Sequence, residues 1–220
     1  MADRAIAGAW VHNSGMAVLL AALVLTVFVM PAFVPSGATR SLLGEVLISL
    51  ILVSGVVAVA EHRRTAMALA AVSLAVIALG WTQFVAPASH APGLRDLAAM
   101  GAFGVLAAAV GINVFASGHQ IGDRVFGAVV LYLLLGLIWG VAFHVVNLAN
   151  PNAFSVQSPV APDLSNWVYF SFVTLTTVGY GDITPVAQSA RSLATLEALV
   201  GQLYPAVIIA RLVSLQASSK

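Results

Sequence analysis

Six runs of about 20 mostly apolar residues follow one another along this sequence, and they restrict it to a membrane-spanning fold. A helix needs about 20 such residues to cross the ~30 Å hydrocarbon core of a bilayer. The first run exceeds the apolar core of a secretory signal, and Asp3 weakens the basic character of the segment before it, so we expect a retained helix. The predicted fold is an all-α membrane protein with six transmembrane helices. The expected spans are 16–34, 41–60, 66–85, 97–115, 125–146 and 192–215.

The composition agrees with these runs. Of 220 residues, 60% are hydrophobic and 8% are charged, which leaves too few polar side chains to cover a soluble globule of this size. The net charge of +1 is spread without basic runs, so we expect no nucleic-acid partner. Cysteine is absent, which excludes disulfides and thiolate metal sites. The first four runs lack a cluster of Asp, His or Ser residues suited to catalysis, so we expect neither an enzyme nor a prosthetic group.

A segment of a different kind, 147–190, lies between the fifth and sixth runs. Its first part is polar and contains several prolines, as expected for an exposed loop. Residues 167–176 are apolar but number only about ten, too few to cross the bilayer. We therefore predict a half-membrane helix that enters and leaves on the same side, capped at its N-terminus by Asp163 or Ser165.

The sequence Thr177-Val178-Gly179-Tyr180-Gly181 follows this short helix. Non-helical backbone at membrane depth is tolerated only where it is buried in protein or lines an aqueous path. Glycine adopts positive φ without penalty, as a strand requires when its successive carbonyl groups all point one way. Four such strands around an axis would stack rings of carbonyl oxygens, with the Thr177 hydroxyls as the innermost ring. Such rings can replace the water shell of a potassium ion.

Residues Thr174 to Pro185 resemble the signature loop of tetrameric potassium channels, in the six-transmembrane, voltage-gated-like architecture. The resemblance implies that Thr177, Val178, Gly179 and Tyr180 coordinate the conducted K⁺ ions and that Gly181 closes the outer mouth of a selectivity filter. It places Asp182 behind the filter, tied to a donor on the pore helix, for which Tyr169 or Trp167 is available. One such loop in each chain implies a homotetramer, so the expected partners are other copies of this chain and the lipid bilayer.

The resemblance also divides the chain near the polar stretch 117–123. Residues 1–120 would form a four-helix voltage-sensor-like domain, and residues 121–220 a pore domain with outer helix, pore helix, filter and inner helix. The expected fourth helix lacks the family's arginines at every third position, and only Arg95 stands at its outer edge. Because steep gating uses about three to four charges in each subunit, we expect weak or no voltage dependence.

Two residues of the sixth run are candidates for gating. Gly201 falls where related channels carry a hinge glycine, although close helix packing explains a membrane glycine equally well. Pro205 removes a backbone hydrogen bond and should bend the helix. The sequence leaves hinge and packing open for Gly201.

Two intramembrane carboxyl groups are further gating candidates, because a charge at this depth is costly. Glu45 would form an ion pair with Arg95 or Arg40, or else sense protons. Glu197 would pair with Arg191, or face the fifth helix or the pore helix.

The expected function is passive, potassium-selective conduction across a cell membrane. The alternatives are a less selective cation channel, which the intact Tyr180 disfavours, and a potassium-transport subunit. Related transporters carry four degenerate loops in one chain, so a single loop with both Gly179 and Gly181 favours the channel. With both termini in the cytoplasm the positive-inside rule is obeyed, and the alanine- and valine-rich spans are consistent with a bacterial inner membrane. The basic residues then inside are Arg4, Arg63, Arg64, Arg124, Arg211 and Lys220, and those outside are Arg40, Arg95 and Arg191.

Overall fold

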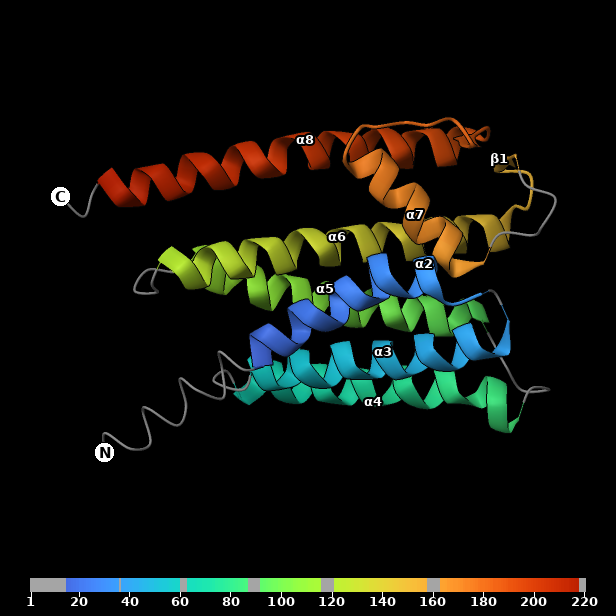
Figure 1. Ribbon diagram of the computed structural model, residues 1–220, viewed down its shortest axis with the longest axis horizontal. Helices are drawn as coiled ribbons and strands as arrows, with labels where there is room; N and C mark the ends of the chain where they lie inside the picture. Colours follow the sequence, from blue (N-terminus) through green and yellow to red (C-terminus); the bar gives the residue numbers. More distant parts are fainter. Residues whose placement is uncertain are drawn as a thin grey trace. The chain divides into compact units, whose positions relative to one another are not determined.

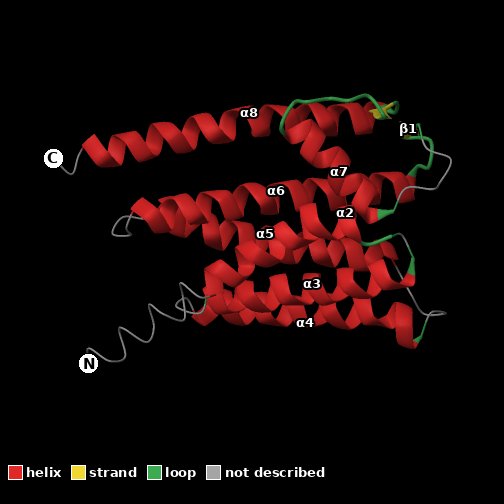
Figure 2. Ribbon diagram, in the orientation of Figure 1, coloured by secondary structure: helices red, strands yellow, loops and turns green. Residues whose placement is uncertain are grey.

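The protein is helical almost throughout (Figures 1 and 2). The computed structural model describes residues 15–35, 37–59, 63–86, 92–115, 121–157 and 163–217. Within these ranges, 6 helices are long and apolar enough to cross a membrane. This confirms the predicted spans to within a few residues and makes the chain a multi-pass membrane protein. The helices are Gly15–Phe33, Ala38–Ala58, Ala66–Val85, Gly93–Ile112, Arg124–Ala149 and Gln188–Arg211.

The chain divides into two compact units, Met1–Leu134 and Leu135–Lys220. Their boundary falls inside one long helix, α6 (Ile121–Ala149), which begins within the polar stretch 117–123. Most of that stretch, 117–120, lies outside the described residues, as do both chain ends whose cytoplasmic placement the sequence predicts. The roles assigned to the two domains stay predictions.

The first unit is a bundle of antiparallel helices (Figure 1). Its first span contains a π-helical turn that ends two residues before Pro31, a residue whose missing N–H disturbs the regular α-helical hydrogen bonding. Close packing of α3 on α5 depends on Gly55, where a Cβ would lie 2.7 Å from a methyl group of Leu106. The elements are helical residues 15–24, η1 (Leu25–Val29), α2 (Met30–Phe33), α3 (Ala38–Ala58), α4 (Arg63–Val85), α5 (Pro92–Phe115) and the start of α6.

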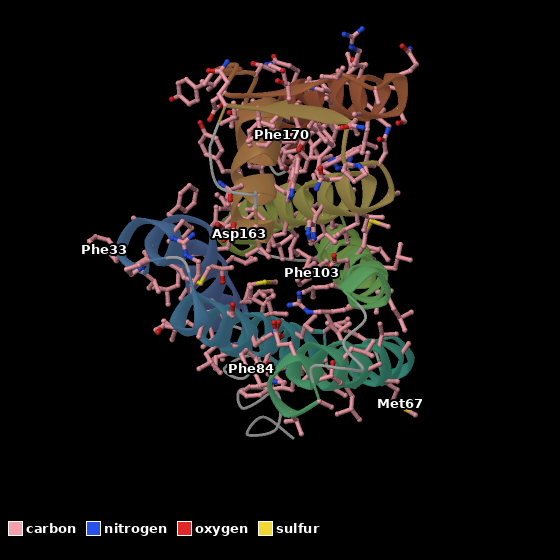
Figure 3. The ribbon with its side chains drawn as sticks, turned by 90° about the vertical axis from the view of Figure 1, so that its right-hand side faces the viewer. Phe33, Met67, Phe84, Phe103, Asp163 and Phe170 are labelled. Carbon is pink, nitrogen blue, oxygen red and sulfur yellow. The ribbon has the colours of Figure 1, made fainter. Side chains whose placement is uncertain are left out.

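Large apolar side chains cover the outside of the first unit as well as its interior. Phe103 is buried, whereas Phe33 and Met67 are 80% and 62% exposed and lie at the edges of the bundle in Figure 3. A helix with apolar groups on its outer face as well as its inner face suits a hydrocarbon solvent. The exposed side chains therefore fit the membrane setting predicted from the sequence.

The second unit consists of the rest of α6, β1 (Phe154–Val156), α7 (Leu164–Leu175), β2 (Ile183–Pro185) and α8 (Gln188–Ala217). Helix α7 has 12 residues and so is about 18 Å long, too short to cross the hydrocarbon core. Asp163 caps it: its Oδ1 accepts from the N–H of Asn166, while Asn166 Oδ1 accepts from the N–H of Asp163. The predicted cap is confirmed for Asp163, and Ser165 Oγ donates to the same carboxylate.

The strands β1 and β2 pair antiparallel, with Phe154 opposite Pro185 and Val156 opposite Ile183. β1 follows the end of α6 and β2 precedes the start of α8. Helix α7 and the loop 176–182 therefore begin and end at the same two-stranded ribbon. The ribbon fixes both ends of that excursion at one end of the unit.

An aromatic cluster holds α7 in the second unit. Phe143 of α6 lies 4.8 Å from Phe170 of α7 between ring centroids, and Phe154 of β1 lies 4.7 Å from Trp167. Figure 3 shows Phe170 among the packed side chains of this unit. The cluster is completed by Ala153, Ile183, Ala190 and Ala194. Because these groups come from both strands and three helices, their packing fixes the position of α7 within the unit.

Two glycines on α6 allow α7 to approach closely. A Cβ at Gly140 would lie 2.8 Å from Val168 Cα, and one at Gly136 would lie 2.4 Å from the ring of Phe172. Small residues four apart commonly serve such contacts between membrane helices. The spacing of four residues between Gly136 and Gly140 is a signal for this packing face that is readable in the sequence.

Candidate functional site

The loop 176–182 has an unusual backbone. Positive φ occurs at every second residue of its centre, at Thr177 (59°), Gly179 (61°) and Gly181 (82°). The two glycines are the positions where the sequence predicted such angles. Thr177 is the additional one, and positive φ is uncommon for a β-branched residue, so the surrounding structure must hold it in place.

Hydrogen bonds to α7 and α8 supply that support. The N–H of Thr177 donates to the carbonyl of Thr174, and its hydroxyl donates to the carbonyl of Thr176 at 2.7 Å. Gln202 of α8 donates from Nε2 to the same hydroxyl at 2.8 Å. The N–H groups of Val178 and Gly179 both turn back to the carbonyl of Val173. Gln202 was not identified from the sequence, where an amide in the middle of an apolar helix was the available signal.

The outer part of the loop is tied to α7 and to the segment after β1. Asp182 is hydrogen-bonded to the phenol of Tyr169, one of the two donors suggested by the sequence. Partial burial, then this hydrogen bond and the carboxylate charge, raise the pKa of Tyr169 above 10.0, so the phenol keeps its proton at neutral pH. Gln157 donates from Nε2 to the carbonyl of Gly181 and from its N–H to the carbonyl of Asp182.

Trp167, the other suggested donor, has a different environment. Its side chain is fully buried in the aromatic cluster, and its Nε1 has no hydrogen-bond partner among the residues that the structure describes. Tyr169 therefore anchors Asp182, and Trp167 contributes packing.

Helix α8 lies directly against the end of α7 at Gly201. A Cβ at this position would lie 1.9 Å from the carbonyl oxygen of Leu175, which is backbone and has little freedom to move. Of the two interpretations that the sequence left open, this contact supports close packing. Pro205 lies inside α8 and offers no N–H to the carbonyl of Gly201 one turn earlier.

Glu197 of α8 points toward α7 rather than toward Arg191. Its Oε1 lies 2.5 Å from the hydroxyl of Ser171 on α7, and its side chain is fully buried. Arg191 donates instead to the carbonyl of Pro185. Ser171 and Leu175 lie one turn apart on α7, and their partners Glu197 and Gly201 lie one turn apart on α8. The two helices therefore stay in contact over one full turn.

Glu45, in the first unit, forms an ion pair with Arg95. It also accepts from Gln83 Nε2 at 3.0 Å, so the buried carboxylate links α3, α4 and α5. Gly80 provides the space, because a Cβ there would lie 2.1 Å from Glu45 Oε2. Arg40, the other suggested partner, donates to the carbonyls of Pro31 and Val34.

Comparison with known proteins connects this geometry to a function. Residues 127–216 match a family model described as an ion channel. The chain is 39% identical over 82 residues to protein LctB of Bacillus caldotenax and 36% identical over 92 residues to protein LctB of Geobacillus stearothermophilus. It is 33% identical over 84 residues to two pore potassium channel c of Oryza sativa subsp. japonica.

The alignment with protein LctB of Bacillus caldotenax covers 37% of this chain and 59% of that relative, and the one with LctB of Geobacillus stearothermophilus covers 42% and 63%. The alignment with the rice channel covers 38% of this chain and 18% of that relative. No solved structure matches the chain. The match to the family model includes the whole excursion from α6 through the loop to α8. The matches therefore support an ion channel, with its channel domain in residues 127–216.

Proposed function

We propose that this chain is one subunit of a homotetrameric, potassium-selective channel whose selectivity filter is Thr177-Val178-Gly179-Tyr180-Gly181. The observation that carries the proposal is the positive φ at every second residue of this segment. Alternating backbone handedness turns successive carbonyl groups toward one side of the strand. A ring of such carbonyls replaces the hydration shell of K⁺ without a formal charge in the path.

The exposure of the loop favours assembly from several copies. Val178 and Tyr180 are 52% and 71% exposed in a single chain, although both follow a well-packed helix. One chain carries one such strand and encloses no pore. Four copies around an axis would cover these side chains and bring four carbonyl rows together.

The short helix α7 contributes through its dipole. In the proposed arrangement α7 is a re-entrant pore helix, and its C-terminal end at Leu175 lies next to the first filter residues. The C-terminus of a helix carries partial negative charge, which favours a cation nearby. This effect would add to that of the carbonyl rings at the inner end of the filter.

We also propose weak or absent voltage dependence. Arg95, the basic residue of α5 considered as a sensor charge, is in an ion pair with Glu45. A paired charge moves through the field only if its pair is broken or moves with it. Steep gating uses about three to four charges per subunit, each contributing about 2.3 kcal/mol per 100 mV.

Ion flux from proteoliposomes tests the proposal. Purified protein in liposomes loaded with K⁺ should release it down a gradient, Ba²⁺ should stop the flux, and Na⁺ should not replace K⁺. Gly179→Ala should abolish selective flux, because its φ of +61° strains any L side chain. Gly101→Ala is the matched control, since Gly101 lies within α5 and a Cβ there meets nothing within 4 Å. Equal Na⁺ and K⁺ flux would contradict selectivity.

A further inference from the structure

A buried polar cluster connects the three helices of the second unit. Ser171 of α7 places its hydroxyl 2.7 Å from the carbonyl oxygen of Gly136 on α6. The same hydroxyl lies 2.5 Å from Oε1 of Glu197 on α8. Both side chains are 0% exposed in a single chain. The cluster thus exists within one subunit and does not depend on neighbouring copies.

The proton count of this cluster is informative. A serine hydroxyl has one proton to donate and lone pairs that accept. The carbonyl of Gly136 can only accept, so it takes the proton of Ser171. The contact between Ser171 and Glu197 is then a hydrogen bond only if Glu197 supplies the second proton. A carboxylate in this position would leave one close oxygen–oxygen contact without a hydrogen between its atoms.

The charged groups nearby do not stabilise an anion at Glu197. On α8 Arg191 donates to the carbonyl of Pro185, and Tyr169 of α7 bonds to Asp182. His144 of α6 and Tyr204 of α8 are further titratable groups on these helices, and neither is bonded to Glu197 among the described contacts. Arg211 of α8 lies about 21 Å along the helix from Glu197. The other carboxyl oxygen, Oε2, has no hydrogen-bond partner among the described residues. Burying an unpaired carboxylate costs several kcal/mol.

We propose that Glu197 is protonated at neutral pH and acts as a positioning residue for the filter, donating to Ser171, which donates to the carbonyl of Gly136. This inference rests on the proposed channel function. The chain of two hydrogen bonds fastens the inner helix α8 to the pore helix α7 and the outer helix α6. One turn further along α8, Gly201 contacts Leu175 and Gln202 contacts Thr177. The two hydrogen bonds at Glu197 therefore hold α8 in the position from which it supports the filter.

Removal of the proton has a direct consequence. A carboxylate repels the lone pairs of Ser171 unless that hydroxyl turns away from Gly136. If the hydroxyl keeps donating to Gly136, its hydrogen bond with Glu197 is lost; if it turns toward Glu197, the carbonyl of Gly136 loses its donor. In both cases a buried polar group is left unpaired. We therefore expect conduction to require the neutral carboxyl group.

Infrared difference spectroscopy on the purified protein tests the protonation state without any need for conduction. At neutral pH the wild-type spectrum should contain a protonated-carboxyl C=O band that is absent from Glu197→Gln. Glu45→Gln is the matched control, because Glu45 is in an ion pair and its replacement should leave that band in place. Absence of a band assignable to Glu197 would overturn the proposal even if K⁺ flux is normal.

Flux measurements test the positioning role. Glu197→Gln keeps a neutral donor for Ser171 and should retain K⁺ flux, with no loss at alkaline pH where the wild type declines. Glu197→Ala and Ser171→Ala should each lower flux about tenfold, and the double variant should be no worse than either single one. Independent, additive losses, or a Gln variant as impaired as the Ala variant, would overturn the role. Loss of flux in every protein, wild type included, with the carboxyl band present would instead refute the channel function alone.

Discussion

Each unit of this protein buries a glutamate side chain in a helix of membrane-spanning length, and the two carboxyl groups are satisfied in different ways. In the first unit Glu45 lies against Arg95 and Gln83, which supply a positive charge and an amide donor. In the second unit Glu197 meets the hydroxyl of Ser171. A buried anion needs a cation or several donors, whereas a neutral acid needs only its own hydrogen bonds. The comparison teaches that depth in the membrane does not by itself decide the charge of a carboxyl group; its immediate partners do.

Arg95→Ala should have the largest effect on this comparison. It removes the cation and leaves a buried carboxylate, so the free energy of unfolding should fall by about 3–5 kcal/mol. Chemical denaturation in detergent measures the loss. Arg191→Ala is the control, because Arg191 is exposed and donates to a backbone carbonyl. A loss as small as that of the control would mean that Glu45 does not depend on its cation, and the contrast between the units would disappear.

Gly201→Ala should have the next largest effect on stability, and Gly80→Ala is the variant to compare with it. A methyl group at 201 meets the backbone oxygen of Leu175, while one at 80 meets the end of the Glu45 side chain. That side chain can move aside by loosening its contacts with Arg95 and Gln83, whereas the backbone oxygen cannot. We expect a loss of about 3 kcal/mol at 201 and about 1 kcal/mol at 80. Thermal unfolding of both variants, followed together with K⁺ flux, compares them. Retained flux and stability in Gly201→Ala would contradict the tight contact between α8 and α7.

The substitution Glu→Gln compares the two carboxyl groups directly. Glu45→Gln leaves Arg95 without its main counter-charge, although Asp96 Oδ1 lies 3.7 Å from Arg95 Nη1, so we expect a loss of about 2 kcal/mol. Glu197→Gln exchanges one neutral donor for another and should cost less than about 1 kcal/mol. Denaturation of both variants at neutral pH gives the two values. The reverse order would make Glu197 the charged group of the pair.

Tyr169→Phe should have the smallest effect. It deletes the hydrogen bond to Asp182 and keeps the ring, so a loss of about 1 kcal/mol is expected at the outer end of the loop. The readout is the K⁺ concentration needed to protect the protein against thermal unfolding, which should rise. An unchanged K⁺ dependence would indicate that the hydrogen bond between Tyr169 and Asp182 does not contribute to the support of the loop.

Features that depend on local chemistry were predictable from the sequence. The spans could be read from apolar length alone, since the hydrocarbon thickness sets that length. The cap of α7 and the glycines with positive φ were also predictable, because each follows from local backbone chemistry. Thr177 was not predicted to have positive φ, since its conformation is held by the backbone contact with Thr174 and the contact of Gln202 with its hydroxyl rather than by its own preference.

Partners of the buried charges were only partly predictable. Topology placed Arg40 and Arg95 at the same side as Glu45, but the rotation of the helices about their axes decides which one meets it. The same rotation turns Glu197 toward Ser171 and away from Arg191. Apolar runs without a strong polar face carry little information about rotation, because lipid and protein are both acceptable surroundings for an apolar side chain.

The sequence by itself determined the membrane setting, the number of spans, the short helix and the five-residue loop that follows it, because hydrophobic length and glycine backbone freedom act locally. Only the tertiary structure decided that Gly201 is a packing contact, that Arg95 is the partner of Glu45, and that Ser171 joins Glu197 to Gly136. The physical reason is that these contacts join helices far apart in the chain, and their geometry depends on how the helices pack against one another rather than on any single segment.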